Sequence, residues 1–271
     1  HTKRRFIKSN NMRRKMKRRK KKMLKKVLLI DGDILAYRIA TANEQSTDWG
    51  NGLWTLHCDE NKCKVDLDNH IDDLGSNLEA EDYICALTDK NNFRKDVLPS
   101  YKDNRKQKRK PMVLNALREY IMKKHNGVIY KNLEADDVLG ILATEPHPTE
   151  DRIIVSIDKD MKQIPAKVCR DGEHIEDIPE RLANYWFMIQ TLAGDSTDGY
   201  TGIPNIGVKT AEKLIRKYTN VPLLDLWKIV VGAYKAKGYT KKEALQQARV
   251  AHILRHKEYN KKTGKVKLWR I

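Results

Sequence analysis

Short apolar runs of strand length recur along the chain, and acidic residues follow them. The runs lie at residues 27–30, 83–87, 127–130 and 152–157. An all-apolar run of this length is typical of a strand buried on both faces, as in a parallel sheet. Three runs end in Asp31, Asp89 and Asp158. Because the carboxyl ends of parallel strands meet at one edge, the pattern predicts an α/β fold with a mostly parallel central sheet, flanking helices and acids on that edge.

Helical periodicity fills much of the remaining chain. Apolar positions recur at helical spacing in residues 112–124 and 181–193, and a helix begins after the first predicted strand. Thr240 and Glu243 form a capping-box pattern that opens a helix running to about Tyr259. Residues 43–77 have no period that predicts an element. We therefore expect three regions: a basic, disordered extension at 1–23, an α/β domain at 24–180 and a helical domain at 181–271.

The net charge of +18 is unevenly distributed. Residues 1–26 hold 15 Lys and Arg and no acid, which leaves 39 bases against 36 acids elsewhere. The extension could be an arm that grips phosphates. Our alternative hypothesis is that translation starts at Met23 and that residues 1–22 are a translated leader. Outside this extension, any nucleic-acid surface must be local.

The sequence indicates a cytoplasmic protein with reduced thiols. Residues 27–30 are too short to span a membrane, and no segment has the order of a secretory signal. Four cysteines are present without a C-x-x-C pair. The spacing of His57, Cys58, Cys63 and His70 fits no standard zinc pattern.

The densest acidic motif is Leu133–Gly140, in which Glu134, Asp136 and Asp137 precede an apolar run. Acids are ordinary in a first helical turn, where free N–H groups favour negative charge. Other segments, however, also offer acids at strand ends or in loops, namely Asp31, Asp33, Asp89, Asp158, Asp160, Asp195 and Asp198. Such a set of carboxylates suits Mg²⁺ or Mn²⁺.

Two further segments suggest contact with a phosphate backbone. Residues 101–111 are densely basic behind a leading Tyr101, a pattern that fits either a solvated face or a groove that holds a nucleic-acid strand. Residues 202–211 read G-I-x-x-I-G-x-K-T-A. The glycines allow a tight hairpin between helices, and the following helix N-terminus can hold a phosphate, with Lys209, Lys213 and Lys217 adding charge.

These motifs together resemble the phage and bacterial 5′→3′ exonuclease/flap endonuclease family. The motifs are I-D-G-D (30–33), T-D (88–89), F-R-K (93–95), Y-K-x-N-R (101–105), L-E-A-D-D (133–137), S-x-D-K-D (156–160) and G-D-x-x-D-G-Y-x-G-I-x-x-I-G-x-K-T-A (194–211). The likeness runs in matching order from about Val27 to Glu212, with a phage-type exonuclease closest. It implies a PIN/flap-endonuclease-like nuclease domain and a C-terminal helix–three-turn–helix DNA-binding region.

The resemblance also implies roles for individual residues. One metal cluster would comprise Asp31, Asp89, Glu134 and Asp136, with Asp137 close by; a second would comprise Asp158, Asp160, Asp195 and Asp198. Lys102 and Arg105 would meet the scissile phosphate, Tyr101 would stack on a terminal base, and Arg94 matches another basic position. Duplex contacts, with a K⁺ ion held by backbone carbonyls, would come from Gly202, Ile203, Gly207, Lys209, Thr210 and Lys213.

We therefore expect a monomeric, two-metal 5′→3′ exonuclease that hydrolyses DNA phosphodiester bonds, acting in phage replication or primer removal on duplex 5′ ends, overhangs, flaps or RNA–DNA primers. Gln190 stands where some relatives have a Lys, and the basic segment is short for an arch, which favours end degradation over flap threading. The alternatives are a DNA-binding module without catalysis, which leaves the acids unexplained, and a related metal-dependent ribonuclease, which the hairpin disfavours.

Overall fold

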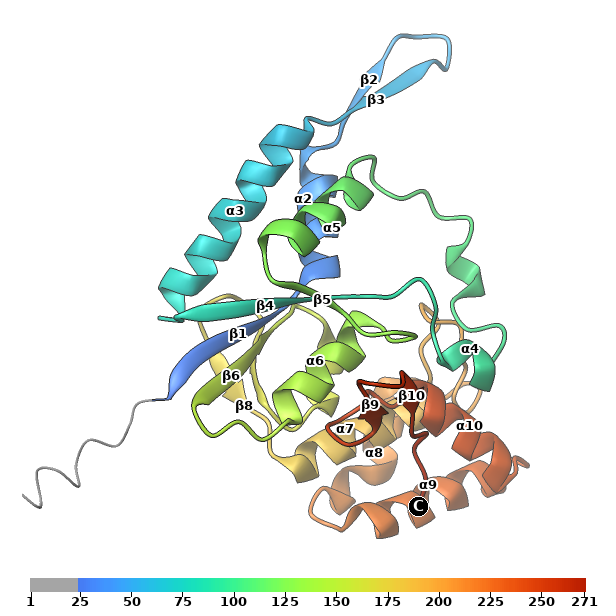
Figure 1. The fold of residues 1–271 in the computed structure, drawn as a ribbon. Coiled ribbons are helices and arrows are strands. Elements are labelled where there is room, and N and C mark those ends of the chain that lie inside the picture. Colours follow the sequence, from blue (N-terminus) through green and yellow to red (C-terminus); the bar gives the residue numbers. More distant parts are fainter. Residues whose placement is uncertain (1–23) are drawn as a thin grey trace, which may run out of the picture.

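A computed structural model describes residues 24–271, so the expectation of disorder for residues 1–23 lies outside the described residues. A six-stranded sheet forms its centre, in the order β5-β4-β1-β6-β7-β8 (Figure 1). All neighbours pair in parallel except β7 and β8. The strands are β1 Lys25–Asp31, β4 Asp82–Leu87, β5 Gly127–Ile129, β6 Glu150–Val155, β7 Lys167–Cys169 and β8 Ile175–Asp177. The mostly parallel sheet predicted from the sequence is confirmed.

Helices cover both faces of the sheet because successive side chains of its central strand point to opposite sides. Leu28 and Ile30 of β1 pack into a cluster that includes residues of three helices on one face: α2 Gly32–Asn43, α3 Glu60–Asn77 and α5 Leu114–Lys124. Leu29 packs on the other face against α6 Ala135–Thr144. All four strand residues from Val27 to Ile30 are buried, as an all-apolar run requires.

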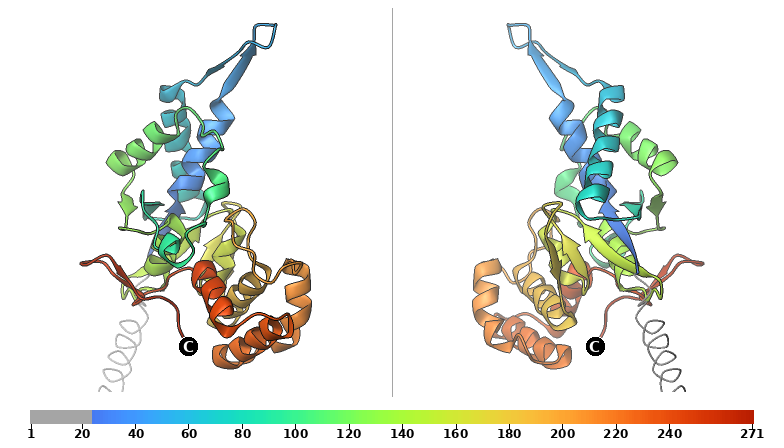
Figure 2. Two further views of the ribbon diagram at one scale, coloured as in Figure 1. Left: turned by 90° about the vertical axis from the view of Figure 1, so that its right-hand side faces the viewer. Right: turned by 90° about the vertical axis from the view of Figure 1, so that its left-hand side faces the viewer.

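The stretch that the sequence left unassigned contains a hairpin and a long helix. Strands β2 Gln45–Asp48 and β3 Trp54–His57 form a two-stranded ribbon that projects from the body (Figure 2). Helix α3 follows and buries Cys63, Leu67, Ile71 and Leu74, which stand at helical spacing. The helical signal was therefore present, but the polar residues between these four positions obscured it.

The last third of the chain packs as helices beside the sheet (Figure 1). These helices are α7 Glu180–Ala193, α8 Val208–Ile215, α9 Leu223–Ala236 and α10 Lys241–Ala251. They share one apolar core, to which Tyr101 and Trp269 also contribute. The capping box predicted at Thr240 and Glu243 is present. Short elements complete the fold: α4 Arg94–Val97, η1 Asp103–Arg105, η2 Lys159–Gln163, η3 Arg216–Tyr218, β9 Tyr259–Asn260 and β10 Lys265–Val266.

Helix α10 ends at Ala251 rather than near Tyr259, so the predicted length was wrong. Residues 250–254, here called the C-terminal strap, return to the sheet domain and contact α6. Gly140 of α6 makes this possible, because an added Cβ there would lie 2.4 Å from the Leu254 carbonyl oxygen. The strap is therefore held by tertiary contacts that override the local helical pattern. No helix in residues 24–271 combines the length and apolar character needed to cross a membrane.

Candidate active site

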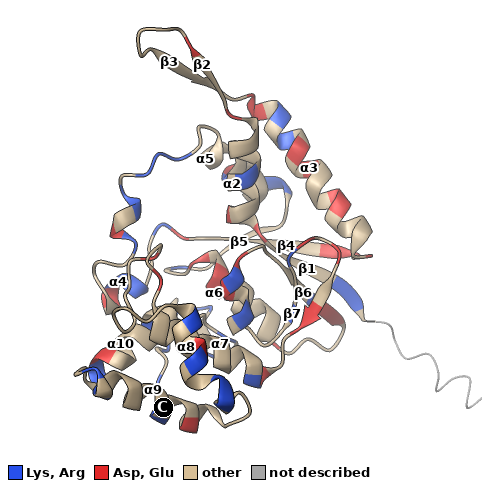
Figure 3. Ribbon diagram, turned by 180° about the vertical axis from the view of Figure 1, so that it is seen from behind, with Lys and Arg blue, Asp and Glu red and all other residues tan. Residues whose placement is uncertain are grey.

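A cleft of about 450 Å³ opens at the carboxyl edge of the sheet. Acidic positions of α2 and α6 lie at this edge (Figure 3). The topology brings together most of the acids predicted from separate strand ends and loops. The carboxylates lining the cleft are Asp31, Asp33, Glu134, Asp136, Asp158, Asp160, Asp195 and Asp198, and Lys102 and Arg105 line it with them.

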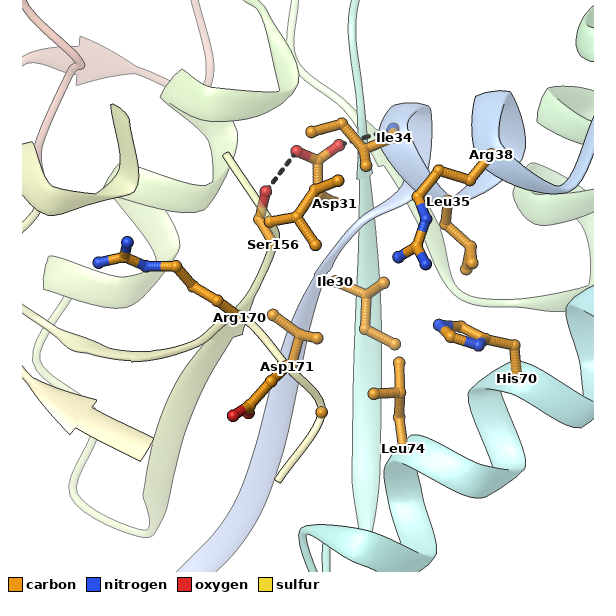
Figure 4. A pocket seen from close by; sticks show the side chains of 13 residues that line it. Ile30, Asp31, Ile34, Leu35, Arg38, His70, Leu74, Ser156, Arg170 and Asp171 are labelled. Carbon is orange, nitrogen blue, oxygen red and sulfur yellow. Dashed lines mark hydrogen bonds between the residues drawn. The ribbon is translucent and has the colours of Figure 1, made fainter. Parts of the chain in front are cut away.

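Asp31 both caps a helix and faces the cleft. One carboxylate oxygen accepts a hydrogen bond from the backbone N–H of Ile34 at 3.0 Å, and the other accepts one from the Ser156 hydroxyl at 2.9 Å (Figure 4). Burial raises the pKa of Asp31 to about 7, and negative charge on Asp33 adds to the shift. The Asp31 side chain thus caps α2 and also lines the cleft.

The acids around Asp31 also resist ionisation. Burial raises the pKa of Asp136 well above its ordinary value, and Asp31 and Asp158 add repulsion. Burial likewise raises the pKa of Asp160 to about 7, again with repulsion from Asp158. Gln190 donates to one Asp160 oxygen at 3.1 Å, while the other oxygen is buried without a hydrogen-bond partner. The cleft therefore holds more negative charge than its own surroundings neutralise.

Two basic residues offset part of this charge. Lys102 forms an ion pair with Glu134 and lies 3.5 Å from an Asp198 oxygen, while Arg105 forms an ion pair with Asp198. Burial alone would raise the pKa of Glu134, but the positive charges of Lys102 and Arg94 hold it below its usual range. Lys102 adopts a left-handed backbone conformation (φ 59°) and donates its backbone N–H to the Asp198 carbonyl. Such strain at a non-glycine residue is common in functional sites.

Three of the predicted site residues are too buried for their predicted roles. Arg94, only 2% exposed, donates to both oxygens of Asp137 at 2.6 and 2.9 Å, and Asp137 has no exposed surface. Arg94 and Asp137 therefore neutralise one another in the interior, which argues against the predicted catalytic role of Arg94 and the predicted metal-binding role of Asp137. Tyr101 is 2% exposed, and its hydroxyl lies 2.9 Å from both Glu134 and Asp198, so it orients carboxylates instead of stacking on a base.

The structure places Asp89 outside the cleft and Asp33 inside it. One Asp89 oxygen accepts the backbone N–H of Asn132 at 2.8 Å, which stabilises the turn before α6. Asp33 pairs with Arg118 of α5 at 2.7 Å through one oxygen, and its other oxygen accepts the backbone N–H of Thr88 at 2.8 Å. Sequence reasoning missed Arg118 and the exposed Tyr37, which line the cleft from helices α5 and α2. No local motif marks them, because the packing of these helices sets their position.

The cleft residues fit divalent cations by charge and by donor type. Hard oxygen ligands, mutual repulsion of the clustered carboxylates and the partnerless oxygen on Asp160 all favour a cation between the acids. Within residues 24–271, no three His, Cys, Asp or Glu side chains already stand in a metal-holding arrangement. Lys102, Arg105 and Arg118 instead neutralise individual carboxylates. Binding of a cation therefore requires these acids to turn toward a shared point.

A smaller pocket of about 200 Å³ shares Asp31 with the cleft. Figure 4 shows Arg38 and His70 facing one another across it, above apolar side chains such as Leu74. Burial lowers the pKa of His70, and the positive charge of Arg38 lowers it further. His70 is thus kept neutral and is separate from Cys58 and Cys63, whose sulfur atoms lie 3.5 Å apart.

The glycine-rich hairpin joins α7 to α8. Gly202 has φ +57°, and an added Cβ would lie 2.4 Å from the Leu192 carbonyl oxygen, so only glycine fits there. Ile203 is 1% exposed and anchors the turn in the helical core, so it does not offer its side chain to DNA. The side chains of Lys209, Thr210 and Lys213 are exposed, and Gly207 is the exposed N-cap residue of α8.

Comparison with known proteins identifies the family of the chain. The sequence model described as "5'-3' exonuclease, N-terminal resolvase-like domain" matches residues 26–177. The exodeoxyribonuclease of Enterobacteria phage T3 is 30% identical, over 90% of this chain and 92% of that protein. The chain belongs to the 5′–3′ exonuclease family.

Other members of the family are also similar to this chain. The exonuclease of Escherichia phage T7 is 29% identical over 90% of this chain and 93% of its own. The flap endonuclease Xni of Shewanella baltica strain OS223 is 31% identical over 61% of this chain and 68% of its own. A solved structure of the flap endonuclease of bacteriophage T5, in a pseudo-enzyme-product complex with DNA and metal ions, has a TM-score of 0.61 at 16% identity, covering 84% of this chain and 89% of that one. This last likeness shows the shared fold.

Proposed function

We propose that this family member is a divalent-metal-dependent 5′→3′ exonuclease that hydrolyses phosphodiester bonds at duplex DNA ends, with Mg²⁺ or Mn²⁺ as cofactor. The observation that carries the proposal is the gathering of eight buried or half-buried acidic side chains in one cleft, including one Asp160 oxygen that has no hydrogen-bond partner. A DNA-binding module without catalysis has no use for such a set, because clustered acids repel phosphates.

The carboxylates would hold two ions in two neighbouring groups. Asp31, Glu134 and Asp136 lie at the end of β1 and the start of α6, while Asp158, Asp160, Asp195 and Asp198 come from the segments after β6 and α7. When bound, two such ions activate a water molecule and stabilise the leaving oxygen of an in-line attack on phosphorus. Asp33 lines the cleft and Asp89 does not, so Asp33 is the better candidate for an additional ligand.

Lys102 and Arg105 would change partners when substrate enters. Without substrate each neutralises a carboxylate, Lys102 on Glu134 and Arg105 on Asp198. With Glu134 and Asp198 committed to a cation, Lys102 and Arg105 would be free to donate to the scissile phosphate. They would then stabilise charge that develops in the transition state. Tyr101 supports this exchange by holding the positions of Glu134 and Asp198 from the helical core.

The duplex would be gripped by the hairpin and the first turn of α8. The backbone N–H groups there and the exposed Lys209, Thr210 and Lys213 suit phosphates without reading bases. A K⁺ ion held by backbone carbonyls of the same turn belongs to the proposal. In this view residues 24–180 provide the nuclease chemistry, and residues 181–271 provide the grip on DNA.

Cleavage of 5′ flaps is a second candidate activity, and the segment between α4 and α5 favours it. Asn104 and Arg105 donate to the backbone carbonyls of Ser196 and Thr197 on one side of the cleft. Arg109 forms an ion pair with Glu44 at the end of α2 on the other side. The segment therefore bridges the cleft rim, and a single strand that passes beneath it would meet the acids.

The test uses a duplex labelled at either 5′ end, with and without a 5′ flap. Mononucleotides or short oligonucleotides should leave the 5′ end in Mg²⁺ and not in EDTA. Asp158→Asn should abolish cleavage while retaining duplex binding and the circular dichroism of the wild type. Binding of duplex without cleavage in Mg²⁺ or Mn²⁺ would overturn the proposal, and a loss of folding would make Asp158 structural. Release of an intact flap would assign the second activity.

A further inference from the structure

The segment after the C-terminal strap holds an unusual concentration of positive charge. Residues 24–271 contain 41 Lys and Arg against 36 Asp and Glu, a balance of +5. Residues 255–271 alone contribute seven bases and one acid, a balance of +6. The rest of the described chain is therefore close to neutral, and its excess charge lies in this one short segment.

This charge is displayed on a fixed hairpin, here called the C-terminal basic hairpin (residues 257–267). Tyr259 stacks on Tyr130 of the sheet domain, with ring centroids 5.6 Å apart and planes 11° from parallel, and its hydroxyl donates to the Lys131 carbonyl oxygen. The side chain of Asn260 accepts two backbone N–H groups of the turn, those of residues 262 and 263. The hairpin is thus held in place by aromatic packing and by hydrogen bonds.

The strand pattern points the lysines outward. Val266 and Leu268 pack against the core cluster beneath the hairpin, so the alternating Lys265 and Lys267 stand on the solvent side, where both are exposed. Two residues along an antiparallel strand advance about 6.8 Å. Two nucleotides along one DNA strand advance about the same distance along the helix axis. The two ammonium groups can therefore lie beside phosphates of a single strand.

Most of the hairpin's charge has no internal partner. Lys261 forms an ion pair with Glu145 at 2.9 Å. Within residues 24–271, Lys257, Lys262, Lys265 and Lys267 form no ion pair, and all four are exposed. Gathering four unpaired lysines costs repulsion that an external polyanion would relieve. Lysines are point charges that contact phosphates without the fixed bidentate geometry of arginine, which suits a backbone more than a specific motif.

The hairpin and the proposed duplex grip lie on different sides of the molecule. The hairpin β9–β10 and α8 overlap in Figure 1, but the turned views of Figure 2 show the red hairpin on one side of the sheet domain and the orange α8 region on the opposite side. One short duplex cannot touch both surfaces without wrapping around the body. We propose that the C-terminal basic hairpin binds the phosphate backbone of a second duplex segment, so that the protein holds two stretches of DNA at once. This inference rests on the proposed action on DNA.

The experiment mixes short blunt duplexes that carry either a donor or an acceptor fluorophore, in EDTA so that no cleavage occurs. Wild-type protein should bring donor and acceptor together and produce energy transfer. Lys265→Gln/Lys267→Gln should reduce the transfer to background. The matched variant Lys123→Gln/Lys124→Gln removes the same charge from the far end of α5 and should leave the transfer unchanged. Light scattering of the protein without DNA should give a monomer mass in every case.

Salt dependence gives a second readout. Each lost phosphate contact should make the slope of log affinity against log salt concentration shallower by about 0.9. For binding of the second duplex, the slope of the double variant should therefore be shallower than that of the wild type by about 1.8. Cleavage of a single short duplex in Mg²⁺ should be unchanged in both variants, because that substrate uses only the cleft and α8.

The outcomes separate this inference from the proposed function. Wild-type protein that cleaves but does not bridge duplexes refutes only the second surface. Protein that bridges but never cleaves refutes only the nuclease assignment. Loss of single-duplex cleavage in Lys265→Gln/Lys267→Gln would place the hairpin on the main substrate path and overturn the inference. Binding of polyglutamate by wild-type protein, without bridging of duplexes, would overturn it in favour of an acidic protein partner.

Discussion

The buried pair of Arg94 and Asp137 allows one prediction to be worked through in detail. Asp137 accepts two hydrogen bonds from the Arg94 guanidinium, and it also accepts the backbone N–H of Leu254 at 3.1 Å. Arg94 in turn donates to the carbonyl oxygens of Val250 and His252 at 2.8 and 2.7 Å. The pair therefore fastens the C-terminal strap to α4 and α6, next to the cleft.

Asp137→Asn keeps the shape of the side chain and removes its charge. Burial alone would lower the pKa of Arg94, and Asp137 raises it well above its ordinary value. Without that carboxylate the guanidinium still stays charged, because arginine does not give up its proton in proteins. Removing one partner of a buried pair typically costs about 3–5 kcal/mol. The Glu134 carboxylate lies 3.4 Å from Arg94 and still offsets part of its positive charge in the variant. We therefore expect a destabilisation at the lower end of this range, about 3 kcal/mol. For a chain of this size that corresponds to a fall in Tm of about 6–12 °C.

Differential scanning calorimetry of three variants checks this reasoning. Asp82→Asn breaks the exposed pair of Lys25 and Asp82 and should cost less than about 1 kcal/mol. Arg94→Met/Asp137→Leu removes both buried charges and should be more stable than Asp137→Asn, since no unpaired charge remains. A Tm for Asp137→Asn equal to that of the wild type, or a double variant less stable than the single one, would refute the account of a charge-paired strap.

Three further predictions concern catalysis, pH and packing. Lys102→Ala and Arg105→Ala should each lower kcat about 100-fold with little change in duplex affinity, and an equal loss of affinity would show that they only bind substrate. The pKa of Asp31 is about 7 in the fold against an ordinary 3.8, so its contribution to stability is lost as pH rises through 7. Mg²⁺ should therefore raise Tm more at about pH 8 than at about pH 5.5; the reverse order in thermal melts would contradict the metal assignment. Gly140→Ala should destabilise by about 1–3 kcal/mol, because its Cβ meets the strap, whereas Gly75→Ala in α3 meets nothing and should stabilise by about 0.5–1 kcal/mol in denaturant titrations.

Local sequence patterns were enough to predict the sheet and most of the acidic set. An all-apolar run such as residues 27–30 can be buried only between two helical layers, and the acid after it must then lie at the carboxyl edge. Local patterns suffice to predict where these acids lie, and Asp31 and Asp158 do line the cleft. The glycine-rich hairpin could also be predicted from the sequence, because a position such as Gly202 tolerates no side chain.

Contacts between distant segments set which charged residues face the cleft and which are internal. Arg94 and Asp137 stand in acidic and basic motifs that look functional, yet the C-terminal strap covers them and turns them into a buried pair. Asp33 enters the cleft because Arg118 of α5 packs against α2, a contact between residues 85 positions apart. The exposure of these charged side chains depends on contacts between segments that are distant in the sequence. A local sequence pattern does not show which distant segments pack against it.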